Sequence, residues 1–553
     1  MRKEKKILLV LMAMGAVLMS IPFLVPHCGW VSLFALVPLL CMDYIAKENG
    51  IRRFWMWHYA TFVLWNAITT FWVSNATIGG GIFAVLANAL QMSVIFGLFR
   101  LSRKKFSGVL PYVFLAAMWI AWEKWYLLSA QISWPWLVLG NGFARTLSLC
   151  QFYEYTGTLG GSLWIWLSNL AIFGTMVSIA EGRWSSLWNP KQRIAAIAGL
   201  VLVVSAPAIW SAVIWNTYQE QSEGELEVAI AQPNFDPYQK FQALTQEQQN
   251  AILLDVFDNA IADRKNDTLS AQKPLLLLAP ETFTSDISIG ELQTSPTWNR
   301  FANYIGNYPG ANILFGASSH EFIFQDGRPS WTARRYRDGV WYQSRNTALL
   351  LDATGRTDLY HKTKLVVGVE STPYPALFSR IDDMLGGVMG RCIGQDEVNV
   401  LNVRTYDQNG NVASNIPVGC AICYESIYGE FCADYVKKGA KALAVITNDA
   451  WWGNTPGYVQ HCSYSSLRAI ELRRDIARCA NTGISCFIDQ KGQLHQPTEY
   501  WVKAHIRGNV NLNSKITFFA SHGDIAGRIC TFVFFLMLLA LLVRFFVREP
   551  ERH

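Results

Sequence analysis

Pro274-Leu-Leu-Leu-Leu-Ala-Pro-Glu-Thr282 is a run of four leucines that leads into a proline, a carboxylate and a hydroxyl side chain. A short, continuous apolar run is typical of a strand that is covered on both faces of its sheet, as in layered α/β proteins. Comparable runs precede and follow it, and they alternate with stretches of helical periodicity. We therefore predict an α/β layered domain over residues 217–524, which is long enough to bury a core of its own.

The period of the apolar residues predicts the elements of this domain. Strands are expected at Leu226–Ala231, Pro274–Leu278, Asn312–Ala317, Asn346–Asp352, Pro417–Cys423, Ala440–Thr447 and Ile484–Asp489. Helices are expected at Thr245–Arg264, Thr297–Tyr308, Ile427–Lys438 and Tyr458–Ala480. The segment Gly386–Gly410 has weak patterning and is expected to be a loop at the edge of the domain.

The rest of the chain is apolar enough for a membrane. The 553 residues are 51% hydrophobic and only 16% charged, and the 22 tryptophans suit the boundary between lipid and water. Apolar stretches of about 17–23 residues can cross the hydrocarbon core as helices. Eight are predicted, at residues 6–23, 29–46, 54–75, 80–101, 109–128, 160–181, 194–216 and 525–547. This gives a polytopic helical bundle in 1–216, the polar domain in 217–524, and a last span with its tail in 525–553.

Basic residues in short loops predict the orientation, because such loops stay in the cytoplasm. With eight spans, the basic loops fall on one side, so that both termini are cytoplasmic and the α/β domain lies outside. These residues are Arg2, Lys3, Lys5, Lys6, Lys47, Arg52, Arg53, Arg103, Lys104, Lys105, Arg183, Lys191, Arg193, Arg544, Arg548 and Arg552. A cleaved leader over residues 1–25 is the alternative, but its long apolar run and lack of a clear cleavage site favour a retained span.

An ionisable pair, Glu123 and Lys124, lies near the outer end of the fifth predicted span. Such a pair either faces a polar cavity or extends its charges to the interface. The next segment, Ser133–Gly140, combines proline with tryptophan. It is expected to be a re-entrant or interfacial piece rather than a straight helix.

Polar residues that directly follow predicted strands are candidates for a site, because ligands of α/β folds gather where strands end. Glu281 follows the four leucines, Lys362 follows a strand pair, and Cys423 leads from a strand into a helix. Each residue alone has an ordinary structural explanation. Together they provide a base, an oxyanion partner and a thiol that this turn should expose and ionise more readily. An acyl group could then pass through a thioester.

The sequence around these three residues resembles the nitrilase superfamily, in the stretches Pro280-Glu-Thr282, Tyr360-His-Lys362 and Cys423-Tyr-Glu425. With the membrane segments, the resemblance extends over nearly the whole chain to the bacterial apolipoprotein N-acyltransferases. Further matching stretches are Trp134–Gly140, Ala231–Asn234, Asn448–Gly453, Arg468–Glu471 and Asn481–Gly483. The chain departs from the family at Ala279, where tryptophan is usual, and within Val366–Glu370, which retains the carboxylate of the family's second essential acid.

The resemblance implies an αββα sandwich outside the cytoplasm and an enzyme of the bacterial inner membrane. Its acyl donor would be a phospholipid, and its acceptor the α-amine of the N-terminal diacylglyceryl-cysteine of an apolipoprotein. No metal, organic cofactor or nucleic-acid partner is implied. The implied roles are Glu281 as base, Lys362 as oxyanion partner and Cys423 as nucleophile, with Glu370, Tyr424 and Glu425 in support.

Alternatives stay open at two residues and for the function. Lys364 competes with Lys362, because alternate residues of an extended segment point to the same side. Cys420 and Cys423 form a Cys-x-x-Cys pair, which in another setting indicates a redox or metal site. A membrane-tethered amidase would use the same three residues with water as the acceptor. A transporter or receptor is the other alternative, which the scarcity of charges in the spans disfavours.

Overall fold

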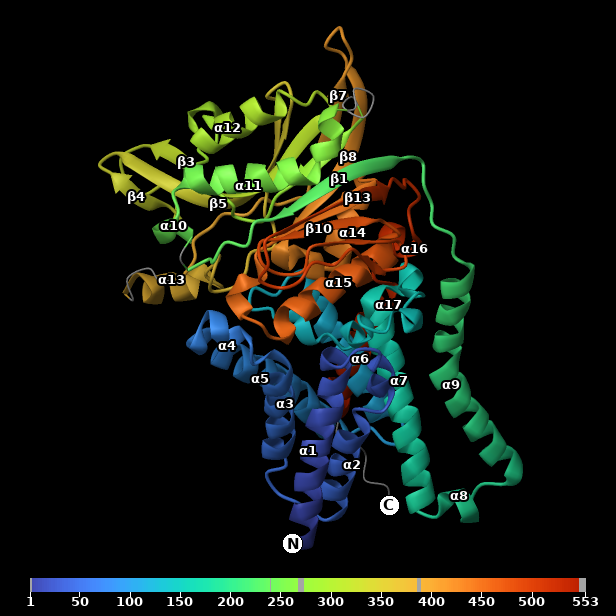
Figure 1. Cartoon of the computed structure of the whole chain (residues 1–553). Coiled ribbons are helices and arrows are strands. Elements are labelled where there is room, and N and C mark those ends of the chain that lie inside the picture. The colour runs from blue at the N-terminus through green and yellow to red at the C-terminus, as the bar shows by residue number, and fades with distance from the viewer. Residues whose placement is uncertain (1, 239, 267–272, 385–388, 547–553) are drawn as a thin grey trace. The chain divides into compact units, whose positions relative to one another are not determined.

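The computed structural model describes residues 2–238, 240–266, 273–384 and 389–546 (Figure 1). The chain divides into two compact units. The first unit comprises Met1–Tyr218 and His522–His553, and its described residues form helices and the turns between them. The second comprises Gln219–Ser521, and it is built of strands and helices.

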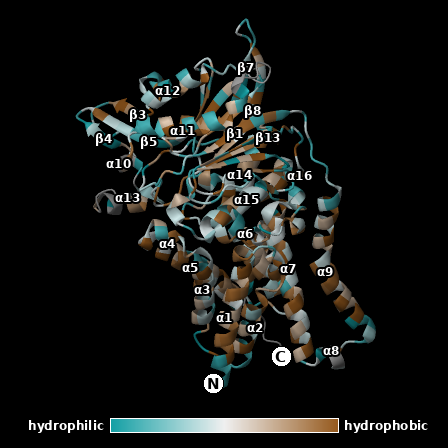
Figure 2. Cartoon of the chain, viewed as in Figure 1, coloured by the Kyte–Doolittle hydropathy of each residue, from teal (hydrophilic) through white to brown (hydrophobic). Residues whose placement is uncertain are grey.

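Long apolar helices form the first unit, and Figure 2 shows hydrophobic residues along helices such as α1 and α9. The helices are α1 (Arg2–Leu24), α2 (Val37–Glu48), α3 (Trp55–Thr70), α4 (Val73–Ala76), α5 (Ile78–Ser102), α6 (Leu110–Leu128), α7 (Tyr153–Ala180), α8 (Arg183–Ser186), α9 (Pro190–Thr217) and α17 (Ile525–Phe546). Helix α7 is kinked at Gly157, whose φ of 65° suits a residue without a Cβ. A further short helix, α16 (Phe518–His522), crosses the boundary between the units.

The number of spans differs from the prediction of eight. In the described part of the chain, six helices are long and apolar enough to cross a membrane: Lys3–Leu24, Gly29–Glu48, Ile78–Ser102, Tyr153–Ala180, Pro190–Thr217 and Ile525–Phe546. The predicted spans 54–75 and 109–128 are wrong by this measure. Helix α3 has 16 residues, which gives it a length of about 24 Å, short of a hydrocarbon core of about 30 Å. Helix α6 has 19 residues but contains Glu123 and Lys124.

Basic loops of the helical unit meet at one of its ends. The C-terminal ends of α2, α5 and α7 lie together there, as does the C-terminal end of α17. Helices α3 and α6 lead the chain between this end and the opposite one, although neither qualifies as a span. The contacts that establish this end are Asp43 with Arg100 and Arg103, Tyr44 with Glu181, and Arg544 with the carbonyl of Lys105.

Glu123 is completely buried within the helical unit. Its carboxylate accepts hydrogen bonds from the indole N–H of Trp119 at 3.1 Å and from the backbone N–H of Leu139 at 2.8 Å. The segment that it holds consists of two 3-10 turns, Pro135–Leu137 and Leu139–Phe143. The proline-tryptophan segment is therefore bent, and the buried Glu123 carboxylate accepts a hydrogen bond from its backbone at Leu139.

Two sheets lie at the centre of the second unit. In its described residues, one sheet has the order β13-β1-β2-β3-β5-β4, with β6 paired to β5, and the other has the order β12-β11-β10-β9-β8-β7. Strands β1, β2 and β3 run parallel, as do β8, β9 and β10. The strands are β1 (Glu225–Gln232), β2 (Leu275–Leu278), β3 (Ala311–Phe324), β4 (Arg334–Arg337), β5 (Val340–Asp352), β6 (Thr357–His361), β7 (Val400–Tyr406), β8 (Val412–Ile422), β9 (Ala442–Thr447), β10 (Ile476–Ala480), β11 (Cys486–Ile488), β12 (Leu494–His495) and β13 (Ala504–Asn511).

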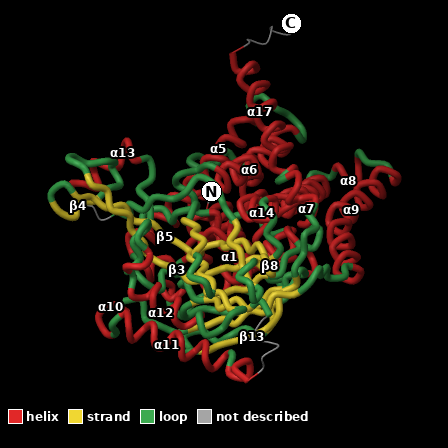
Figure 3. The backbone as a smooth tube through the Cα atoms, turned by 90° about the horizontal axis from the view of Figure 1, so that it is seen from above, coloured by secondary structure: helices red, strands yellow, loops and turns green. Residues whose placement is uncertain are grey.

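Helices cover the outer faces of the two sheets, and Figure 3 shows α11 and α12 along one side of the strands. Helices α11 and α12 contact β1 and β3 of the first sheet, while α14 and α15 contact β8 and β11 of the second. The sheets contact each other through pairs such as β1 with β10 and β5 with β7. The second unit is therefore an α/β domain in which helices contact each sheet and the two sheets contact each other. The helices are α10 (Lys240–Ala243), α11 (Gln246–Ala260), α12 (Pro296–Ile305), α13 (Pro375–Met384), α14 (Gly429–Lys437) and α15 (Pro456–Leu472).

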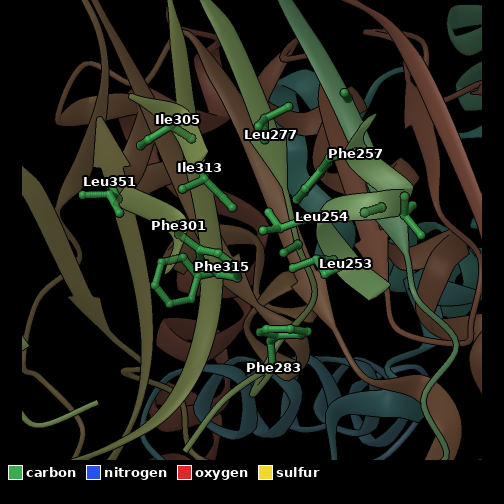
Figure 4. Close-up of a cluster of buried hydrophobic side chains, with 14 of the residues drawn as sticks. Leu253, Leu254, Phe257, Leu277, Phe283, Phe301, Ile305, Ile313, Phe315 and Leu351 are labelled. Atoms are coloured by element: carbon green, nitrogen blue, oxygen red, sulfur yellow. The ribbon is translucent and has the colours of Figure 1, made fainter. Parts of the chain in front are cut away.

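A hydrophobic core lies between the first sheet and helices α11 and α12 (Figure 4). Its side chains come from alternate positions of the strands, such as Leu277, Ile313 and Phe315, and from the inner faces of the helices. Helix α11 begins where the sequence predicts, because Thr245 and Gln248 form a reciprocal capping box. Each fully buried leucine or phenylalanine contributes about 1.5–3 kcal/mol, so this layer fixes the strands that lead to the site.

Several segments differ from the predicted elements, and three of them involve strands or helix ends near the two sheets. The helix expected over Tyr458–Ala480 ends at Leu472, because Arg473 adopts a left-handed conformation (φ 47°), and the rest forms strand β10. The segment expected to be a loop, Gly386–Gly410, contains strand β7 in its described part, while residues 386–388 lie outside the described residues. Strand β13 has no predicted counterpart and pairs with β1 along its whole length.

Candidate active site

Cys423 lies directly after β8, at the start of the 3-10 turn Cys423–Ile427. Its φ is 52°, a left-handed conformation that residues other than glycine rarely adopt. Two groups hold its carbonyl oxygen: the hydroxyl of Ser426 donates to it at 2.8 Å, and Nε2 of His461 lies 3.0 Å away. Backbone strain that is fixed by its surroundings in this way is characteristic of functional sites.

Glu281 lies in a tight turn after β2, next to Thr282, whose φ is 45°. Gly316 of β3 packs directly against this turn, and a Cβ added to it would lie 2.6 Å from the Cα of Glu281. The carbonyl of Gly316 also accepts the N–H of Phe283 at 2.8 Å. On the other side, Oε2 of Glu281 accepts the backbone N–H of Asn448 at 3.2 Å. The parallel strands therefore fix this carboxylate through backbone contacts.

Lys362 follows β6 and is 1% exposed. Its Nζ lies 3.0 Å from a carboxylate oxygen of Glu281 and 3.0 Å from one of Glu370. The side-chain amide of Asn346 donates to the same two carboxylates, at 2.8 Å and 2.7 Å. Burial disfavours the ammonium, but the two carboxylates raise the pKa of Lys362 well above its usual range. The site thus holds one buried cation between two carboxylates.

Glu425 is completely buried and connects the segment after Lys362 to the strand before Cys423. Burial raises its pKa to about 7, although its hydrogen bonds oppose this increase. Because its two oxygens accept bonds from both segments, it fixes the separation between the candidate cation and the candidate nucleophile. The donors are the Tyr360 hydroxyl (2.6 Å) and the backbone N–H groups of Thr363 (2.7 Å), Lys364 (3.1 Å) and Ile422 (2.8 Å).

The charges of Glu281 and Lys362 act on the Cys423 thiol. Burial and the negative charge of Glu281 raise the pKa of Cys423 well above its usual range, whereas the Lys362 ammonium lowers it. The thiol is therefore protonated at neutral pH in this state. This differs from the expectation that the turn favours ionisation, and it means that a base must remove the proton when the thiol reacts.

A second buried network lies beneath Cys423, and its residues are not among the predicted site residues. Asp449 accepts hydrogen bonds from Arg478 at 2.9 Å and from the Thr447 hydroxyl at 2.8 Å, and its Oδ1 lies 2.8 Å from Nδ1 of His461. The other ring nitrogen of His461 faces the Cys423 carbonyl. Asp449 lies in the stretch Asn448–Gly453, whose resemblance to the family could have indicated it as a site residue. No sequence pattern indicates His461 or Arg478, because the residues that they contact are distant in sequence.

The remaining predicted residues surround this centre. Tyr424 is buried, and its ring packs edge-on against Tyr428 with 5.2 Å between centroids. The amine of Lys364 lies 5.5 Å from the centroid of Tyr428, so the structure brings Lys362, not Lys364, to the two carboxylates. Cys420 is buried within β8. Among the described residues, no cluster of three or more His, Cys, Asp or Glu side chains is arranged to hold a metal ion.

The arrangement suits a proton transfer without net charge change in the buried site. When the carboxylate of Glu281 takes the proton of Cys423, a neutral acid and a thiolate replace a carboxylate and a thiol, and Lys362 stays cationic. Separating charge in a buried site is expensive, so a transfer that keeps the total charge constant is favoured. The site can therefore generate a thiolate at the moment of attack and hold a cation near it.

Two family models match the chain. The model for the apolipoprotein N-acyltransferase N-terminal domain matches residues 15–171, and the carbon-nitrogen hydrolase model matches residues 330–514. The second match includes Lys362, Glu370 and Cys423, whereas Glu281 lies before its start.

Curated relatives extend over nearly the full length. The apolipoprotein N-acyltransferase of Chlorobaculum tepidum is 27% identical over 94% of this chain and 93% of the relative. Apolipoprotein N-acyltransferase 1 of Treponema denticola is 22% identical over 99% of both chains. Among solved structures, Nit3 of Saccharomyces cerevisiae, a member of branch 10 of the nitrilase superfamily, is 13% identical with a TM-score of 0.35. The structural match covers 53% of this chain and 93% of the Nit3 chain.

Proposed function

Because the chain belongs to the apolipoprotein N-acyltransferase family, we propose that it transfers a fatty acyl chain from a phospholipid to an apolipoprotein. The acceptor is the α-amine of the N-terminal diacylglyceryl-cysteine. The observation that carries the proposal is the buried assembly of Lys362 with Glu281 and Glu370 beside the strained Cys423. This assembly combines a base, a cation and a nucleophile in one site.

In the first half of the reaction, Cys423 attacks an ester carbonyl of the phospholipid. Glu281 takes the thiol proton, and the sulfur forms a bond to the carbonyl carbon. The Lys362 ammonium stabilises the oxyanion of the tetrahedral intermediate. The C–O bond then breaks, Glu281 returns the proton to the departing alkoxide, and a lysophospholipid leaves an acyl thioester on Cys423.

In the second half, the α-amine of the acceptor attacks the thioester carbonyl. Glu281 takes a proton from the amine as the C–N bond forms, and Lys362 again stabilises the oxyanion. The C–S bond breaks, and the Cys423 sulfur recovers the proton from Glu281. The products are an amide on the lipoprotein and the free enzyme.

Glu370, Tyr424 and Glu425 act through the other residues in this proposal. The carboxylate of Glu370 holds the Lys362 ammonium and accepts the backbone N–H of Val366 at 2.8 Å, which orients the cation. Glu425 ties the segment after Lys362 to the nucleophile turn, and the ring of Tyr424, within that turn, packs against Tyr428. They are therefore positioning residues, and their loss should lower the rate of both half-reactions.

The helical unit supports a membrane setting for both substrates. Each buried methylene holds a lipid in the bilayer by about 0.8 kcal/mol, so a soluble enzyme would have to extract two anchored substrates. The basic contacts at one end of the helical unit favour the cytoplasmic side for that end. The proposal accordingly puts both termini in the cytoplasm and the catalytic domain in the periplasm of a bacterial inner membrane.

The product of a two-substrate assay tests this function. The purified full chain in detergent is incubated with a phospholipid that carries a deuterated acyl chain and with a synthetic diacylated lipopeptide. We expect a deuterated amide on the lipopeptide, with lysophospholipid formed in equal amount. Release of deuterated free fatty acid, with no acylated peptide, would instead indicate a hydrolase of the amidase type and contradict the proposal. A lipopeptide with an acetylated N-terminus is the control, because it cannot accept the chain.

A further inference from the structure

A cavity of about 330 Å³ lies beside the Glu281 turn, within the α/β unit. Its inner wall is formed by the buried residues Pro237, Lys240 and Asn448, and its rim includes the exposed Ser285, Ser318 and Trp451. The rim makes the cavity accessible from solvent. The mechanism above uses none of these side chains, so the cavity is a second feature of the same domain.

Lys240 is the charged residue among the described residues that line this cavity. It is 7% exposed, and its Nζ donates to the carbonyl of Thr282 at 2.5 Å and lies 5.6 Å from the ring centroid of Phe283. Its backbone is fixed as well, since its N–H donates to the carbonyl of Asp236 and its own carbonyl accepts from Gln249. A lysine so constrained presents its ammonium at a defined position.

The environment of Lys240 favours an anion as its ligand. Burial lowers the pKa of Lys240 to about 7, which means that the surroundings penalise its charge. No carboxylate stands among the described residues that line the cavity, whereas two serine hydroxyls stand at its rim. An anionic group in the cavity would restore the charged form of the lysine, and the hydroxyls would donate to its oxygens.

The cavity is connected to the candidate catalytic centre through two shared residues. Asn448 lines the cavity and donates its backbone N–H to the carboxylate of Glu281. Thr282 also lines it and directly follows Glu281 in the chain. A ligand in the cavity therefore lies next to the reacting groups. In a glycerophospholipid, the phosphate is separated from the scissile ester by no more than the glycerol unit, so the two can occupy adjacent sites.

We propose that this cavity binds the phosphodiester of the phospholipid donor, with the Lys240 ammonium and the rim hydroxyls of Ser285 and Ser318 contacting its oxygens. The inference rests on the proposed function, because it assumes that the acyl donor is a phospholipid. It assigns Lys240 to donor recognition rather than to bond making. The acceptor, which carries no phosphate, would not depend on it.

Acylation of Cys423 by two donors with the same acyl chain tests the assignment. One donor is phosphatidylethanolamine, and the other is the p-nitrophenyl ester of the fatty acid, which lacks phosphate. A hydrogen bond to a charged group contributes about 1.5–3 kcal/mol. Lys240→Met should therefore lower kcat/KM for the phospholipid about 10- to 100-fold, and change that for the ester less than about threefold. Lys240→Arg should retain most of the phospholipid reaction, because it keeps the cation.

The controls separate recognition from a structural role. Lys437→Met removes an exposed lysine that pairs with Asp434 in the same unit, and it should leave both donors unaffected. If Lys240→Met slows both donors equally, Lys240 acts by holding the Thr282 carbonyl and the Glu281 turn, and the assignment is overturned. An unchanged phospholipid reaction in Lys240→Met overturns it too. Should that variant fail to fold, Ser318→Ala replaces it, with the expected loss confined to the phospholipid.

The wild-type protein distinguishes this inference from the proposed function. If wild type is acylated by the ester but not by the phospholipid, the proposed donor is wrong, and the inference fails with it. If wild type is acylated by both, and Lys240→Met keeps the wild-type preference between them, the function stands and the phosphate site alone is contradicted.

Discussion

Replacement of Lys362 by methionine removes the cation of the candidate site and keeps a long unbranched side chain. In the structure the ammonium is 1% exposed and lies 3.0 Å from both Glu281 and Glu370. Leaving a buried ion pair without one partner destabilises a protein by about 3–5 kcal/mol. The Asn346 amide still donates to both carboxylates, so we expect a loss of folding stability at the lower end of that range.

The same substitution should affect the chemistry more than the stability. Removal of one oxyanion donor typically lowers the rate by about 100- to 1,000-fold. The assay is single-turnover acylation of Cys423 by phospholipid, quenched at set times and followed by intact mass. We expect Lys362→Met to slow adduct formation by about that factor, at a temperature where thermal unfolding shows the variant to be folded.

Lys364→Met is the matched control, because it removes a lysine two positions away. Its amine lies over the ring of Tyr428 rather than between the two carboxylates. A contact of this kind stabilises the fold by about 0.5–2 kcal/mol but lies outside the reacting groups, so acylation by the folded variant should change little. A larger loss in Lys364→Met than in Lys362→Met would refute the assignment of the cation, and so would equal losses.

Three further substitutions probe the site. Glu281→Gln removes a negative charge that raises the pKa of Cys423, so the pH midpoint for alkylation of this thiol by iodoacetamide should fall. Acyl transfer should drop by about 100-fold or more, because the base is lost. A midpoint that rises would contradict the electrostatics. His461→Leu removes the ring nitrogen 3.0 Å from the Cys423 carbonyl and should lower stability by about 1–3 kcal/mol, measured by thermal unfolding in detergent; an unchanged Tm would remove its positioning role. Gly316→Ala would bring a Cβ within 2.6 Å of the Glu281 backbone and should impair acyl transfer, whereas Gly199→Ala, where nothing lies within 4 Å of the added Cβ, should not.

Many strands and helices could be predicted, because the sequence patterns that specify them, such as apolar runs and helix caps, are local. The apolar run Leu275–Leu278 predicts β2, and the Thr245 capping box marks the start of α11. Strand β10 could not be predicted, because its central Arg478 is a poor strand signal until Asp449 pairs with it from another part of the chain. The end of α15 at Arg473 likewise carries no glycine or proline.

The predicted number of membrane spans, eight, was too high for a related reason. Hydropathy alone could not reveal that α3 ends after 16 residues, or that Glu123 in α6 is satisfied by the backbone of Leu139. Both features depend on tertiary structure. The contact of Glu123 with Leu139 explains why a polar residue is tolerated in a helix that packs within the bundle.

The candidate site was predictable where polar residues directly follow strands, as Glu281 and Cys423 do. The choice between Lys362 and Lys364 was not predictable from alternation alone, and the structure separates them by their contacts. Asn346 was also missed, because an asparagine at the start of an apolar strand gives no sign that it will bridge two carboxylates.

The central claim is that Cys423 carries the acyl chain during transfer. The most direct measurement is intact and peptide mass spectrometry of the full chain after incubation with phospholipid, in wild type and in Cys423→Ala. We predict one acyl adduct, located on Cys423, which disappears when a diacylated lipopeptide is added and is absent from the variant. An adduct that persists in Cys423→Ala, or one on Cys423 that the lipopeptide does not remove, would contradict the account.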